Sequence, residues 1–311
     1  LPEALFRLGE CYFNLKEYDK AYNFFQRLLQ EFPQNNLSDA ALFQLGWISY
    51  KKEDYPGTRK AFEELLARSP SGEWSDDAQY WYGMSYFLEK NYAVARNELK
   101  KVTINYPKSP FAFRASMSIG DSYYNEKDYK QALKAYQEII TNYPSDPQIA
   151  EAEYVIIQTV LQQGQEKRFS DLSQKFLTRY TYHPLSMTLM FQIAEQELAG
   201  GDTAGARKIL QDIIGKFHQN PEADKAFFQI AELDFQAKDY VPALQTYQIL
   251  LKSYPTSGLR PVVQFKTAQA CFYLKEYQKA SYGFERFIAE FPEHDLVPQA
   301  LYYIGASLYS S

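Results

Sequence analysis

Hydrophobic side chains recur along this chain at helical spacing, in pairs of short segments separated by polar turns. Leu5, Leu8 and Tyr12 fall at i, i+3 and i+7, so they share one face of a helix. After a polar break at residues 16–18, residues 21–29 repeat this spacing. The pattern therefore predicts two amphipathic α-helices joined by a short turn.

The predicted helix pair repeats with a constant period of 37 residues. Small residues mark the first helix of most periods, and proline ends most second helices. Periods of about 20 to 50 residues are typical of arrays in which each unit buries its apolar face against its neighbours. We therefore expect an all-α solenoid. The small-residue series is Gly9, Gly46, Gly83, Gly120, Ile157, Ala194, Ala231, Ala268 and Gly305, and the terminal series is Pro33, Pro70, Pro107, Pro144, Thr181, His218, Pro255 and Pro292.

Each predicted turn carries two polar residues and then a tyrosine, as in Lys-Glu-Tyr at residues 16–18. The polar pair ends the first helix, and the tyrosine can pack back beneath the turn. The second helix has its own small residues, beginning with Ala21, and we expect them to face the small residues of the first helix.

The fifth period departs most from the pattern. Ile157 stands in the glycine position, Phe169 in the small position of the second helix, and Thr181 in the proline position. Because a bulky side chain between two helices forces them apart or pivots them, we expect a bend or an irregular unit at residues 157–181. Neutral drift with local repacking is the alternative. We expect residues 1–311 to form a single array of eight helix pairs plus a ninth first helix, and to be a fragment of a longer protein.

Composition narrows the classes of partner. Aromatic residues make up 17% of the chain, charged residues 23%, and the formal net charge is −5. A mildly acidic surface is a poor ligand for phosphate backbones, so no nucleic acid partner is expected. No apolar run approaches the ~20 residues that cross a bilayer, so membrane attachment would have to come from parts outside this sequence.

The sequence contains no recognisable catalytic or metal-binding constellation. His183 and His294 share one slot of the inter-repeat turns, two residues after the terminal position, and His218 occupies the terminal position itself. No histidine has a second ligand at zinc spacing, and the glycines form no phosphate-binding loop. We expect no enzyme activity, no cofactor and no metal.

The repeat resembles the tetratricopeptide repeat (TPR), whose usual unit has 34 residues. The resemblance covers the whole chain and rests on Leu8-Gly9, Tyr12, Ala21, Phe25 and Pro33 with their equivalents. The three additional residues per unit and the Tyr-Pro ends at residues 106–107, 143–144 and 254–255 are similar to the longer repeats of bacterial envelope proteins. These include the BamD lipoprotein of the outer-membrane β-barrel assembly machine and the coordinator of the Tol-Pal system.

The resemblance implies a right-handed superhelix whose first helices line the concave face. It also implies a non-catalytic scaffold that binds peptide or protein segments in the assembly or maintenance of a Gram-negative cell envelope. The implied location is the periplasm or the inner face of the outer membrane, with the cytoplasm as the alternative.

In the tetratricopeptide register, two rows of side chains on the first helices point inward, and most of them are aromatic. Trp47 and Met84 lie between the rows in the second and third periods. These rings could pack between repeats, form a groove for a peptide, or stack on a glycan in a polysaccharide-export scaffold. Self-association of the array is a further alternative. The candidate peptide-binding residues are Phe6, Phe13, Phe43, Trp47, Tyr50, Tyr80, Met84, Phe87, Tyr124, Phe228, Phe235, Phe265 and Phe272.

Overall fold

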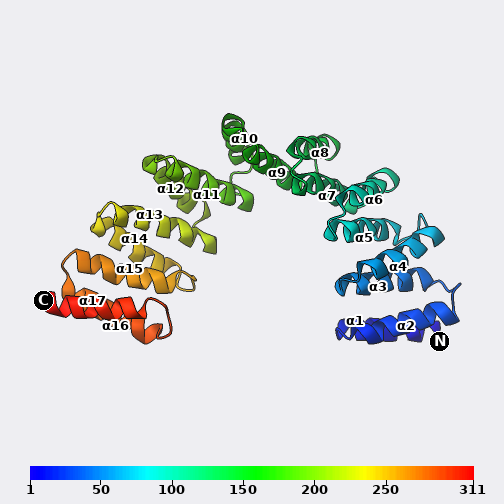
Figure 1. Ribbon diagram of the computed structural model, residues 1–311, viewed down its shortest axis with the longest axis horizontal. Helices are drawn as coiled ribbons and strands as arrows, with labels where there is room; N and C mark the ends of the chain where they lie inside the picture. Colours follow the sequence, from blue (N-terminus) through cyan, green and yellow to red (C-terminus); the bar gives the residue numbers. More distant parts are fainter. The chain divides into compact units, whose positions relative to one another are not determined.

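The computed structural model describes all 311 residues and contains 17 α-helices, one short 3₁₀ helix and no strand (Figure 1). The expected all-α fold is confirmed. The α-helices are α1 (Pro2–Asn14), α2 (Tyr18–Glu31), α3 (Ser38–Lys51), α4 (Tyr55–Arg68), α5 (Ser75–Leu88), α6 (Tyr92–Asn105), α7 (Phe111–Asn125), α8 (Tyr129–Asn142), α9 (Ile149–Gln162), α10 (Glu166–Arg179), α11 (Pro184–Ala199), α12 (Thr203–Phe217), α13 (Asp224–Gln236), α14 (Tyr240–Ser253), α15 (Arg260–Tyr273), α16 (Tyr277–Glu290) and α17 (Val297–Ser310). The 3₁₀ helix η1 (Pro221–Ala223) precedes α13.

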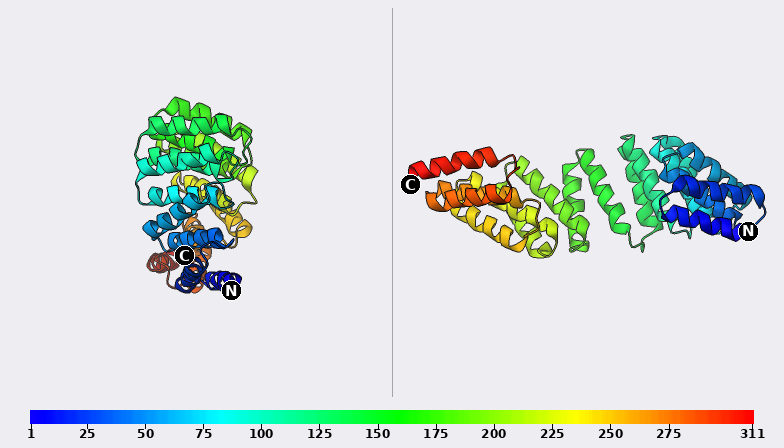
Figure 2. Two further views of the ribbon diagram at one scale, coloured as in Figure 1. Left: turned by 90° about the vertical axis from the view of Figure 1, so that its right-hand side faces the viewer. Right: turned by 90° about the horizontal axis from the view of Figure 1, so that it is seen from below.

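The helices form hairpins that stack on one another within two compact units, residues 1–174 and 175–311. From α1 to α8 and from α11 to α16 an odd-numbered helix packs against the even-numbered helix that follows, and each of these hairpins packs against the next helix along its unit (Figure 2). The boundary between the units falls inside α10, in the fifth period. The single array over residues 1–311 and the bend at 157–181 stay predictions.

Every hairpin turn contains one residue in the left-handed backbone conformation. Lys16 has φ 62°, and the same conformation recurs every 37 residues in eight turns, twice at glycine. In the first turn the N–H of Lys16 donates to the carbonyl of Phe13, and the N–H of Glu17 donates to that of Tyr12. This is a Schellman motif, which satisfies carbonyls left free at a helix end. The eight residues are Lys16, Glu53, Lys90, Lys127, Gly164, Gly201, Lys238 and Lys275.

The turn tyrosines pack against rings on the preceding first helix, as the sequence predicts. The ring centroids of Tyr18 and Phe13 are 5.5 Å apart, in a tilted arrangement. Five further turns repeat this contact across the left-handed residue, which fastens the hairpin at its closed end. The pairs are Tyr50–Tyr55, Phe87–Tyr92, Tyr124–Tyr129, Phe235–Tyr240 and Phe272–Tyr277.

The glycines of the first four hairpins lie beneath bulky side chains, not opposite small ones, so the expected small-on-small contact is wrong there. A Cβ added to Gly9 would lie 2.6 Å from the ring of Phe25, and one added to Gly120 would lie 2.2 Å from that of Tyr136. Glycine is required because a bulky side chain of the second helix, a ring in three hairpins and Leu99 in the third hairpin, fills this space. In the fifth period Ile157 and Ser173 hold the two equivalent positions, and both are buried, so the bulky and small residues have exchanged helices.

Candidate functional site

Four rings of the first predicted row are buried and pack between helices. Phe6 lies 5.3 Å from Phe25, and Phe43 lies 4.8 Å from Trp74, between ring centroids. Their positions leave little surface for a partner, in agreement with the inter-repeat packing alternative. The four are Phe6, Phe43, Tyr80 and Phe265, whereas Phe228 is only half-buried.

The second predicted row is half-buried, because each ring is covered on one side by its turn tyrosine. This row comprises Phe13, Tyr50, Phe87, Tyr124, Phe235 and Phe272. Burial, with smaller contributions from Tyr55 and Tyr80, raises the pKa of Tyr50 to about 12. The Tyr50 phenol is therefore neutral at physiological pH and acts as an apolar ring with a polar tip.

A cluster of partly exposed apolar side chains lies on α3 and α5. Trp47 and Tyr50 stack at 5.4 Å, and the ring of Trp81 lies 4.8 Å from each of them. Met84 and Leu88 follow Trp81 at i+3 and i+7 on the same face of α5, and Leu88 is 42% exposed. We call Trp47, Tyr50, Trp81, Met84 and Leu88 the tryptophan patch.

Sequence reasoning found three members of the tryptophan patch and missed Trp81 and Leu88. Both lie one helical turn from Met84, at i−3 and i+4, so the signal was present in the spacing. Each predicted row takes one position from every first helix. Trp81, Met84 and Leu88 lie on a neighbouring face of α5, outside both rows.

A polar hollow adjoins the patch along α1 and α3. It is lined by Arg7, Glu10, Asn14 and Gln44 among others, and Arg7 and Glu10 form an ion pair at 2.8 Å. The side-chain oxygen of Gln44 is buried and accepts no hydrogen bond. Gln44 lies one turn before Trp47 on α3, but its enclosed oxygen is not accessible from the aromatic surface.

A carboxylate stands at the other side of the patch. Asp77 lies one turn before Trp81 on α5, is half-buried, and forms no hydrogen bond or ion pair. Burial, and then the neighbouring charge of Asp76, raise the pKa of Asp77 to about 6. The Nζ atom of Lys51 lies 4.7 Å from the centre of the Trp47 ring.

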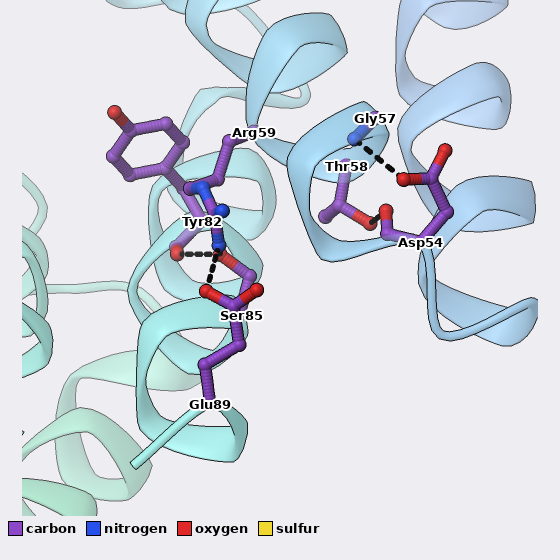
Figure 3. A network of polar contacts seen from close by, with 7 residues as sticks. All are labelled: Asp54, Gly57, Thr58, Arg59, Tyr82, Ser85 and Glu89. Carbon is purple, nitrogen blue, oxygen red and sulfur yellow. Dashed lines mark hydrogen bonds and ion pairs between the residues drawn. The ribbon is translucent and has the colours of Figure 1, made fainter. Parts of the chain in front are cut away.

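A polar network fixes α5 against the preceding hairpin (Figure 3). The guanidinium of Arg59 lies 2.7 Å from Glu89 Oε2, 3.5 Å from the Ser85 hydroxyl, and 4.5 Å from the centre of the Tyr86 ring. The Ser85 hydroxyl donates to the carbonyl of Tyr82 at 2.6 Å. This network places the face of α5 that carries Trp81, so the patch is built on a rigid support.

The same arrangement recurs one period later, where Arg96 contacts Glu126 at 2.6 Å and Ser122 at 3.2 Å. Its guanidinium also lies 4.1 Å from the centre of the Tyr123 ring. The same four residue types, arginine, glutamate, serine and tyrosine, thus make equivalent contacts at two successive hairpin interfaces.

The second unit has an aromatic cluster of different character. Tyr240 and Tyr273 stack at 4.9 Å, and Tyr273 is 42% exposed. The nearby carboxylate of Glu232 is satisfied, because it accepts from the Tyr247 hydroxyl and pairs with Lys266 at 2.9 Å. The carboxylate in this cluster has its partners within the chain, unlike Asp77.

The histidines serve the turns. The Nδ1 atoms of His183 and His294 each accept a backbone N–H from two residues further on, at 3.2 Å. No group of three His, Cys, Asp or Glu side chains is placed to hold a metal ion. None of the helices combines the length and apolar character needed to cross a membrane.

Comparison with known proteins identifies the repeat. One TPR model matches residues 3–35 and 188–218, and a second TPR model matches residues 43–110. A search of curated proteins found no match. The model of the outer membrane lipoprotein family YfiO matches residues 87–180 and 220–311, which is more than half of the chain.

Several solved structures are similar at low identity. A TPR protein from Parabacteroides merdae shares 13% identity over 86% of this chain and 99% of its own, with a TM-score of 0.47. PilW, a type IV pilus biogenesis factor, shares 16% over 72% of this chain and 97% of its own, with a TM-score of 0.48. PilF from Pseudomonas aeruginosa shares 15% over 72% and 95%, with a TM-score of 0.44. The family match decides the assignment: the chain belongs to the outer membrane lipoprotein family YfiO and is built from tetratricopeptide-type repeats.

Proposed function

We propose that this chain is a non-catalytic scaffold of the Gram-negative cell envelope that binds protein segments through the tryptophan patch. Tetratricopeptide arrays are protein-interaction scaffolds, and the matched family is one of outer membrane lipoproteins, which supports an envelope role. Function would be exerted in the periplasm or at the inner face of the outer membrane.

The observation that carries the proposal is the contiguous, partly exposed cluster of two tryptophans, a tyrosine, a methionine and a leucine on α3 and α5. Tryptophan and tyrosine are the residues that most often dominate binding energy at protein interfaces. Burial of one large apolar partner side chain on such a surface stabilises a complex by about 1.5–3 kcal/mol.

The test is to select peptides on the wild-type protein from a displayed random library and to measure their affinities by calorimetry. Trp47→Ala should raise Kd by about 30-fold, which corresponds to ~2 kcal/mol. The matched control is Tyr302→Ala, which removes another exposed aromatic ring, on α17. Far-UV circular dichroism of both variants checks that the helices remain.

Two results would count against the proposal. Undiminished peptide affinity in Trp47→Ala would remove the patch from the interface. Quenching of the tryptophan fluorescence by oligosaccharides, together with a library that yields no peptide, would favour the glycan-binding alternative instead.

A further inference from the structure

We infer that the tryptophan patch selects an extended segment in which a large apolar residue lies two positions from a lysine or arginine that pairs with Asp77. This inference rests on the proposed function and specifies the partner. Two features of the first unit carry it: the unpaired carboxylate of Asp77 and its spacing from Trp81.

Asp77 differs from other acidic residues that face the neighbouring repeats. Glu10 pairs with Arg7, and Asp121 accepts a hydrogen bond from the Tyr136 hydroxyl at 2.7 Å. Asp77 has no such partner, although half of its surface is covered. A partly buried charge without a counter-ion destabilises the free protein. Pairing with a cation from a bound segment therefore stabilises the complex.

The spacing on α5 matches an extended chain. Asp77 and Trp81 are separated by four residues, so their Cβ atoms are about 5–6 Å apart on one helix face. In an extended peptide, side chains on the same side are two residues and ~6.8 Å apart. An apolar side chain over Trp81 therefore places the side chain two residues away above Asp77.

The experiment uses three short synthetic peptides with the cores Phe-Ser-Arg, Phe-Ser-citrulline and Phe-Ser-Glu. Citrulline keeps the shape of arginine without its charge. We expect the wild-type protein to bind the arginine peptide about tenfold more tightly than the citrulline peptide, with the glutamate peptide weakest. Asp77→Asn should reduce the arginine preference to about onefold.

The control is Asp76→Asn, which removes the adjacent carboxylate and should keep the arginine preference. If Asp77→Asn retains a tenfold preference, the inference is wrong. If in addition Trp47→Ala still weakens all three peptides, the proposed function survives that failure. If no phenylalanine peptide binds the wild-type protein and the random library also yields none, both are wrong.

Discussion

At the scale of single residues, Asp77 makes the stability of the first unit depend on pH. Its pKa is raised from 3.8 to about 6, with burial as the main cause. Between these values the unfolded chain releases a proton that the folded chain keeps, so unfolding becomes easier as pH rises. Below pH ~4 the Asp77 carboxyl is neutral and does not lower the free energy of unfolding. Above pH ~6 it is charged, and the loss of stability is complete.

Asp77→Asn should therefore stabilise the protein at pH 7 and not at pH 4. Because about half of the side chain is solvated, we expect a gain of at most ~1 kcal/mol in the free energy of unfolding. Urea titrations followed by tryptophan fluorescence at both pH values measure it. A gain of equal size at pH 4 and pH 7 would contradict the titration of Asp77 as its cause.

The positions of small and aromatic residues could be predicted from the sequence, but the contacts of several could not. The glycine series was evident, yet the ring of Phe25 over Gly9 comes from a helix whose rotation no single-helix pattern specifies. Phe6 and Phe43 were expected to point inward and are buried for the same reason. Their burial depends on neighbours from two other helices.

At the scale of the helical hairpin, the left-handed turn residue sets the end of each first helix. Most L-residues pay about 1 kcal/mol for this conformation, and glycine does not. Lys90→Gly should therefore raise the free energy of unfolding by about 0.5 kcal/mol, since greater freedom of the unfolded chain offsets part of the gain. Gly201, with φ 86°, is the reverse case, and Gly201→Ala should cost about 1 kcal/mol.

Urea unfolding followed by circular dichroism measures both changes. Lys100→Gly serves as the control, because it places glycine within α6, where a loss of ~1 kcal/mol is expected. A destabilising Lys90→Gly would show that the lysine side chain contributes more than the backbone strain costs.

The turns could be predicted from their polar pairs and tyrosines, but their backbone conformation was overlooked. The signal was the alignment of Gly164 and Gly201 with Lys16 and its equivalents in the 37-residue register. Glycine and lysine both occur at this position of the register. Glycine at the end of a helix is typical of the left-handed conformation, so the lysines are expected to share it.

At the scale of the whole molecule, the two compact units should unfold in separate steps. All three tryptophans, Trp47, Trp74 and Trp81, lie in residues 1–174, so their fluorescence reports on the first unit alone. Leu210 is fully buried in the second unit, and Leu210→Ala should cost about 2–4 kcal/mol there. Circular dichroism should detect this loss, while the fluorescence transition stays unchanged.

Leu99→Ala provides the matched control, because Leu99 is equally buried and lies at the same register position in the first unit. It should shift the fluorescence transition to lower urea. If Leu210→Ala shifts fluorescence and circular dichroism together, the 311 residues unfold as one cooperative array.

The fold class and the repeat could be predicted because one spacing recurs without interruption. The division into units was less accessible: the sequence singled out the fifth period, and the boundary at Gln174 lies within it. The division into compact units depends on many weak contacts. A substitution such as Phe169 indicates that the fifth period differs from the others, but it does not specify how the helices of that period pack.

Because the left-handed turn residues recur at a constant interval, a whole 37-residue unit can be removed or added without changing the register of the others. Joining Glu53 directly to Asn91 would delete residues 54–90 and recreate the same turn, since the residue before the junction is already left-handed and the residue after it is the N-cap of α6. The helices downstream would keep their register while α5, with its share of the tryptophan patch, would be gone. The length of such a chain can therefore change in whole hairpins by recombination between equivalent codons, and a binding surface is gained or lost in the same step.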